Sequence, residues 1–200
     1  FIQITHEEYY KRLPKDIWDE IEAIFTDEPS LMTTYVWPLP EKYWGKIPIE
    51  DPLKFEDRPP AIPWIKDFPA IFKERKGYDL IPFLPYLYLD LGETGKYIRQ
   101  DYYEVVTQLY AEAFFKQIGT WCREHGISFT GHILPEENLI LHAAFQGNIY
   151  PLLRNMDIPG IDMLSSDPNN ILNGGGFIAP KIVSSIAHIS GKNLVMSETS

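Results

Sequence analysis

The sequence predicts an α/β fold, a partial (β/α)8 barrel of the TIM-barrel type. Short apolar strands alternate with helical segments, long loops follow the strands, and only short turns precede them. A complete barrel needs about 200 residues at the least and about 250 typically. Four strands in 200 residues therefore correspond to half a barrel. A doubly wound open sheet is the alternative architecture.

The predicted elements follow from apolar spacing and from start and stop residues. Thr5 and Glu8 have capping-box spacing before a short helix, and Asp101 and Glu104 have the same spacing before a long amphipathic helix that stops at Gly126. Further helical segments are expected at 67–76, 80–89, 138–156 and from Pro180 to Gly191. The expected strands are 21–27, 127–132, 160–165 and 193–198.

We expect residues 1–200 to form a single partial catalytic domain inside a larger protein. The loops at 31–63, rich in proline, and at 164–179 interrupt the alternation of strand and helix but do not separate domains. On its own this half-barrel should be inactive, because it lacks the other strands and loops of the parent polypeptide.

The charge balance excludes several classes of partner. With 18 Lys and Arg against 28 Asp and Glu, the net charge is −10, which opposes binding to nucleic acid or to an anionic membrane surface. Aromatic residues make up 14% of the chain, and aromatic faces with carboxylates suit a neutral polyhydroxylated ligand such as a sugar. The lone cysteine, Cys122, excludes an internal disulfide and is expected in the core.

Ionisable side chains stand at the ends of all four predicted strands. They are Asp27 and Glu28, His132, Asp162, and Glu198. Glycoside cleavage needs one carboxylic acid to protonate the leaving oxygen and a second carboxylate as base or nucleophile. We predict Glu28 as the general acid and Glu198 as the base or nucleophile. A carboxylate at position 28 that only caps the next helix is the structural alternative.

Other residues are candidates for substrate binding. Asp27, His132 and Asp162 could contact sugar hydroxyls, and His132 could instead contact a catalytic carboxylate or be purely structural. A site role is also considered for Glu136 and Glu137, which follow Pro135, although carboxylates at a helix start favour the dipole without any function. Trp37 and Trp44, with Tyr43, could form a sugar-stacking wall.

The segment from Phe25 to Ser30 resembles the end of strand four in barrel glycoside hydrolases of clan A, where Asn-Glu-Pro carries the acid/base residue. Asp27 stands in the place of that Asn, so the usual Asn contact to the sugar does not transfer directly. Counting onward, residues 131–132, 161–162 and 197–198 would end strands five, six and seven. Clan A keeps its nucleophile on strand seven, which agrees with Glu198 and implies retention of configuration.

A longer pattern resembles glycoside hydrolase family 106, the α-L-rhamnosidases, which are large bacterial glycosidases. It comprises Phe25 to Ser30, Gly77 to Leu80, Phe129 to His132, Pro159 to Asp162 and Val195 to Thr199. This resemblance implies an inverting hydrolase with a calcium ion near the sugar. Retention and inversion both stay open.

Two other functions are compatible with the same residues. One is a non-catalytic carbohydrate-binding or structural barrel. The other is a metal-dependent hydrolase that uses His132, Asp162 and Glu198 as ligands. Substitution of the two glutamates distinguishes the first from a glycosidase, and chelation distinguishes the second.

Overall fold

The computed structural model describes residues 1–31, 62–134, 136–139, 141–164, 167–173 and 176–199. The chain divides into two compact units. The first comprises residues 1–29, 111–133 and 152–200, and the second comprises 30–110 and 134–151. No helix in the described part of the chain is long and apolar enough to cross a membrane.

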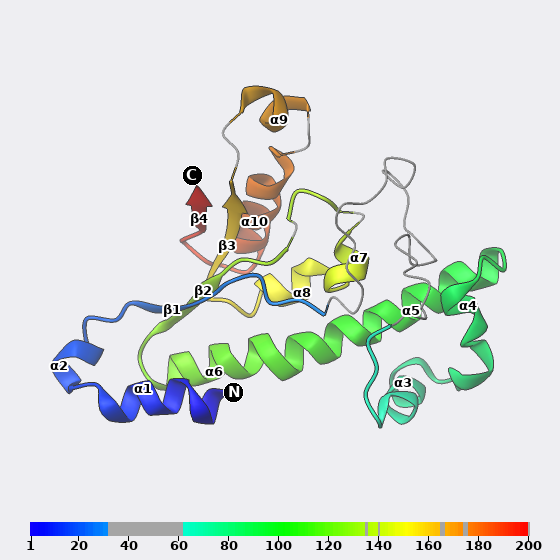
Figure 1. Ribbon diagram of the computed structural model, residues 1–200, viewed down its shortest axis with the longest axis horizontal. Helices are drawn as coiled ribbons and strands as arrows, with labels where there is room; N and C mark the ends of the chain where they lie inside the picture. The colour runs from blue at the N-terminus through cyan, green and yellow to red at the C-terminus, as the bar shows by residue number, and fades with distance from the viewer. Residues whose placement is uncertain (32–61, 135, 140, 165–166, 174–175, 200) are drawn as a thin grey trace, which may run out of the picture. The chain divides into compact units, whose positions relative to one another are not determined.

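The first unit contains a four-stranded parallel sheet. Its strands are β1 (Ala23–Thr26), β2 (Ser128–Gly131), β3 (Ile158–Met163) and β4 (Met196–Thr199). They lie side by side in the order β1-β2-β3-β4, as Figure 1 shows. A doubly wound sheet reverses its strand order at a switch point. These four strands show no reversal, which is the order of neighbouring strands in a barrel.

Helices of the first unit precede or follow these strands. They are η1 (Ile2–Ile4), α1 (His6–Arg12), α2 (Lys15–Trp18), the π-helical segment η4 (Ala111–Lys116), α6 (Gln117–Glu124), α9 (Pro168–Asn173) and α10 (Ile178–Ile189). Helix α6 contacts β2, and α10 contacts β3 (Figure 1). Ile161 of β3 packs with Ala179 and Val183 of α10 in an apolar cluster, so the crossover helix is held to the strand by burial of apolar surface.

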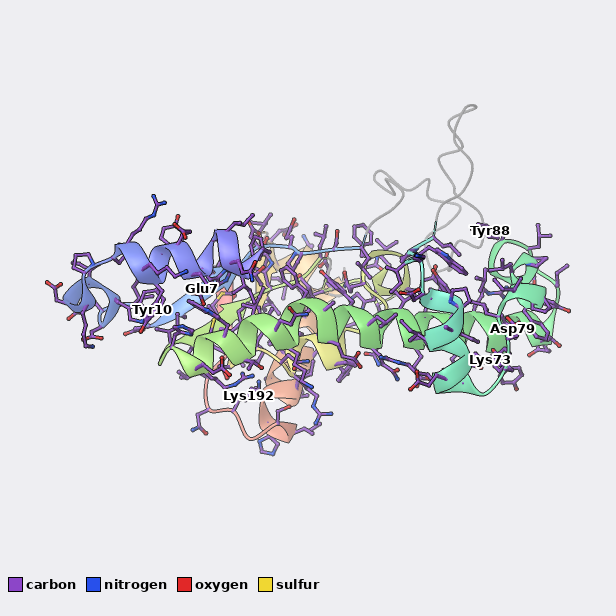
Figure 2. All side chains as sticks on the ribbon, turned by 90° about the horizontal axis from the view of Figure 1, so that it is seen from below. Glu7, Tyr10, Lys73, Asp79, Tyr88 and Lys192 are labelled. Carbon is purple, nitrogen blue, oxygen red and sulfur yellow. The ribbon has the colours of Figure 1, made fainter. Side chains whose placement is uncertain are left out.

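Helix α1 is fixed to α6 by aromatic contacts and one polar contact. Trp121 donates its indole N–H to the Glu7 carboxylate at 2.7 Å. Tyr10 meets the rings of Trp18 and His125 edge to face, with centroids 5.0 and 4.5 Å apart. Figure 2 labels Glu7 and Tyr10 on this helix. These contacts place the segment that leads into β1.

The second unit is helical. It contains α3 (Phe68–Lys76), η3 (Ile81–Phe83), α4 (Pro85–Tyr88), α5 (Glu93–Tyr110) and α7 (His142–Phe145), while α8 (Ile149–Leu153) begins in it and ends in the first unit. Phe68, Phe72 and Leu80 pack with Tyr102 and Val105 of α5 in its core. This unit is stabilised mainly by one face of α5.

The four predicted strands are confirmed, and each observed strand end lies one to three residues from the predicted one. Cys122 is buried as expected, and burial raises the pKa of its thiol to about 11. The thiol is therefore protonated and unreactive at neutral pH.

One predicted helix start is wrong, and one predicted capping interaction is not formed. The long helix begins at Glu93 instead of Asp101. Asp101 lies inside this helix, and its carboxylate pairs with side chains distant in the sequence instead of capping a helix start. Asp101 accepts a hydrogen bond from the Tyr78 hydroxyl at 3.0 Å and lies 2.9 Å from the Lys76 ammonium. Thr5 does precede α1, but its side chain makes no cap hydrogen bond.

One predicted helix and one predicted loop also need correction. The expected helix over 138–156 is two short helices, α7 and α8, because Gly147 adopts a left-handed φ of 76° and ends the first. The expected loop over 164–179 contains α9 and the start of α10. Asp167 caps the N-terminus of α9, because its carboxylate accepts a hydrogen bond from the Asn169 N–H at 3.0 Å.

Candidate active site at the strand ends

The sheet brings the predicted strand-end residues to one edge. Asp27 and Glu28 follow β1, and His132 follows β2. Thr26 pairs with Gly131, so Asp27 and His132 come at the same level. Asp162 of β3 pairs directly with Glu198 of β4. Because the carboxyl ends of parallel strands meet at one edge of a sheet, the five side chains share it.

Glu28 has a strained backbone. Its φ is 42°, and no other non-glycine residue of the described chain has a positive φ. This left-handed conformation costs about 1–2 kcal/mol for a residue with a Cβ. Glycine would avoid that strain, yet the chain has a glutamate there. Strain of this kind is concentrated at active sites and ligand clamps.

His132 connects two carboxylates from different strands. Its side chain is fully buried, and its Nε2 lies 3.2 Å from Oε2 of Glu198 and 3.4 Å from Oδ1 of Asp27. Asp27 is largely exposed and Glu198 is half exposed. The Phe25 ring lies against the imidazole, with centroids 5.6 Å apart. His132 therefore contacts a proposed catalytic carboxylate, one of the two contacts considered from the sequence.

Glycine at position 131 allows the first two strands to approach closely at this edge. Its φ is 140°, and a Cβ there would lie 2.1 Å from the Thr26 carbonyl oxygen. The His132 N–H donates to that same carbonyl at 3.2 Å. Sequence reasoning singled out neither Gly131 as a packing position nor Phe25 as part of the site. A glycine directly before an ionisable strand-end residue is the signal that indicates close backbone approach.

The local electrostatics favour a proton on Glu28. Burial is the largest cause that raises the pKa of Glu28, and the charges of Asp27, Asp162 and Glu198 raise it further. The charge of His132 acts in the opposite direction but does not cancel these effects. Burial also raises the pKa of Asp162, again against the effect of His132. A glutamate with a raised pKa is suited to donate a proton near neutral pH.

The remaining predicted residues lie in the second unit or outside the described part of the chain. Glu136 is buried and Glu137 exposed, both in the second unit. They lie in a turn, which corrects the expectation that they start a helix, since α7 begins only at His142. Trp37 and Trp44, like Tyr43, lie outside the described residues. A substrate-binding role for these residues stays a prediction.

One group among the described residues has the spacing of metal ligands. Ligand atoms of Asp27, Glu28 and His132 lie within 4.8 Å of one another. Calcium takes six to eight oxygen ligands, whereas this group offers two carboxylates and an imidazole whose Nε2 already contacts Glu198. These residues do not fit a calcium site. The set His132, Asp162 and Glu198, predicted for a metal-dependent hydrolase, is not the group that the spacing selects.

Two proteins that this chain resembles are both much longer than it. A protein of Formosa agariphila named "Putative beta-glucuronidase" is 25% identical over 148 residues, which cover 68% of this chain and 11% of that protein. The solved structure of a rhamnosidase from Novosphingobium sp. PP1Y is 21% identical with a TM-score of 0.49, and the match covers 68% of this chain and 13% of that one. The chain thus spans little more than a tenth of either relative.

The family comparison covers most of the chain. A sequence model of glycoside hydrolase family 106, described as alpha-L-rhamnosidase, matches residues 60–200. This range includes three of the four strands and the strand-end residues His132, Asp162 and Glu198. The predicted resemblance is confirmed: this chain belongs to glycoside hydrolase family 106, the α-L-rhamnosidase family.

Proposed function

We propose that this chain supplies both catalytic carboxylates of a glycosidase that cleaves α-L-rhamnosides, with Glu28 as general acid and Glu198 as base or nucleophile. The proposal is carried by the backbone conformation and the surroundings of Glu28. It stands at a strand end with a strained φ of 42°, a raised pKa and a carboxylate from β4 in the same cluster. A cap of the next helix would need none of these features.

The two glutamates have environments suited to different steps. Glu28, partly buried among negative charges, would give its proton to the glycosidic oxygen as the bond to the anomeric carbon breaks. Glu198, half exposed, would accept a proton from an attacking water or attack the anomeric carbon itself. The first course inverts and the second retains the configuration. Either course uses Glu28 as an acid in the bond-breaking step.

The charge of the site favours a neutral sugar. The carboxylates of Asp27, Asp162 and Glu198 are, with His132, the charged groups that act most strongly on Glu28. A glucuronide carries its own carboxylate and would be repelled by this cluster. A rhamnoside has no charge. The part of the site that this chain supplies therefore supports rhamnoside over glucuronide cleavage.

We further propose that β1 to β4 correspond to strands four to seven of a (β/α)8 barrel, and that the remaining strands come from the rest of the parent polypeptide. The non-reversing strand order supports this assignment. The calcium ion implied by the family resemblance stays a prediction with no ligands assigned, and no step above depends on it.

Activity of the full-length protein on a panel of aryl glycosides tests the proposed function. We expect hydrolysis of an aryl α-L-rhamnoside and a kcat/KM at least about 100-fold lower on the matching β-D-glucuronide, because the glucuronide adds a negative charge to the carboxylate cluster. Glu198→Gln should lower kcat on the rhamnoside by about 100-fold or more, because Gln neither accepts a proton nor attacks carbon.

Glu20→Gln is the matched control, since Glu20 is an exposed glutamate of the same unit outside the cluster, and it should leave kcat unchanged. Proton NMR of the first product formed shows whether the anomeric configuration is inverted or retained. Parent-like turnover by both Glu198→Gln and Glu28→Gln would support the non-catalytic, carbohydrate-binding alternative for this site.

A further inference from the structure

His132 is the strongest positive influence on Glu28, and its charge opposes those of the neighbouring carboxylates. Its side chain is fully buried, so the surrounding side chains restrict its position. The backbone fixes it as well, because its N–H donates to the Thr26 carbonyl on the neighbouring strand. A buried imidazole between carboxylates from two other strands is an arrangement that general packing does not require.

We propose that His132 and Asp27 form a positioning pair, in which the imidazole between the two carboxylates holds that of Glu198 in its reactive orientation. The charges of the pair act on Glu28 in opposite directions. This inference rests on the proposed function of Glu28 and Glu198 and adds residues that act through them. Neither member of the pair needs to touch the reacting atoms.

The orienting part of the proposal follows from geometry. One nitrogen of His132, Nε2, lies 3.2 Å from Glu198 and 3.4 Å from Asp27. Glu198 is half exposed on a strand at the side of the sheet and would otherwise sample several rotamers. A contact from a fully buried donor restricts those rotamers. Misplacement of a reacting group by about 1 Å can lower the rate by about 100-fold.

The electrostatic part follows from the signs of the surrounding charges. Glu28 faces Asp27 from its own segment, His132 from β2, Asp162 from β3 and Glu198 from β4. The negative charge of Asp27 raises the pKa of Glu28, and the charge of His132 lowers it. An asparagine at position 27 would be neutral. The aspartate at this position is therefore a charge partner for His132.

Opposite shifts in the pH profile test this pair. In the full-length protein, activity should fall on the basic side as Glu28 loses its proton. Removing the cation in His132→Gln raises the pKa of Glu28, so the basic limb of kcat/KM moves to higher pH. Removing the anion in Asp27→Asn lowers that pKa, so the basic limb moves to lower pH. His188→Gln, an exposed histidine of α10, should move neither limb.

Turnover numbers test the orienting role separately. His132→Ala should lower kcat by up to about 100-fold with little change in KM, and His132→Gln should recover part of that loss because its amide can still donate to Glu198. A raised KM with unchanged kcat would instead indicate a contact to a sugar hydroxyl and would overturn the inference. The inference would also be overturned if His132→Gln and Asp27→Asn moved the basic limb of kcat/KM in the same direction.

The failure of this inference differs from that of the proposed function. If Glu28→Gln and Glu198→Gln lose activity while Asp27→Asn and His132→Gln leave the pH profile in place, only the positioning pair is wrong. If neither glutamine variant loses activity, both proposals are wrong. Asp27 is largely exposed, so Asp27→Asn should fold even where substitution of the buried histidine does not.

Discussion

Glu28→Gln is expected to lower kcat/KM on aryl α-L-rhamnosides with poor leaving groups by about 100- to 10,000-fold, the usual contribution of a general acid. Gln has nearly the shape of protonated Glu but cannot give up a proton. A 2,4-dinitrophenolate leaves without protonation, so the bond-breaking step with that leaving group should stay close to the parent rate. Single-turnover kinetics with a phenyl and a dinitrophenyl rhamnoside measure the difference.

The comparison with Glu198→Gln distinguishes the loss of a general acid from the loss of a base or nucleophile. A variant that lacks the base or nucleophile should be slow with both leaving groups, because attack at the anomeric carbon does not depend on the leaving group being protonated. An equal loss with both leaving groups in Glu28→Gln would show that Glu28 is not the acid. Parent-like rates with both would remove it from catalysis altogether.

Gly131→Ala is expected to lower the stability of the fold strongly. Its φ of 140° is unfavourable for alanine, and the new Cβ would lie 2.1 Å from the Thr26 carbonyl oxygen and 2.7 Å from the Thr26 Cγ2. Backbone strain costs about 1–3 kcal/mol, and overpacking costs about 1–3 kcal/mol more. We therefore expect a loss of about 3 kcal/mol or more in the free energy of unfolding, measured by urea denaturation.

Gly126→Ala is the matched control for that measurement. Gly126 also has a positive φ, of 76°, but nothing lies within 4 Å of the position of its added Cβ. Only the cost of a left-handed conformation for a residue with a Cβ should appear there, about 1–2 kcal/mol. Equal losses at positions 126 and 131 would contradict the close approach of β1 and β2 on which the position of His132 depends.

Sequence patterns predicted the strands because each is a short apolar run with clear borders. β2 lies between Gly126, which ends a helix, and the polar His132, and its predicted and observed ranges nearly coincide. The start of α5 was missed because local spacing cannot show that Asp101 pairs with Lys76 and Tyr78. Long-range partners override local capping signals.

The sequence predicts part of the candidate site, because it predicts the strands and where they end. Parallel strands bring their carboxyl ends together, so the sequence could place Glu28, His132 and Glu198 at one edge. It could not show that His132 lies between Asp27 and Glu198, because that depends on the register of strands far apart in the chain. Nor does apolar periodicity encode the left-handed φ of Glu28.

A double-mutant cycle on Glu28 and Glu198 tests the central claim most directly, namely that the two carboxylates serve one reaction in one site. Groups that act as a unit show strongly non-additive losses. We predict that kcat/KM of the Glu28→Gln/Glu198→Gln double variant on a phenyl α-L-rhamnoside falls within about tenfold of the more impaired single variant. Losses that multiply as for independent positions, or single variants as active as the parent, would contradict it.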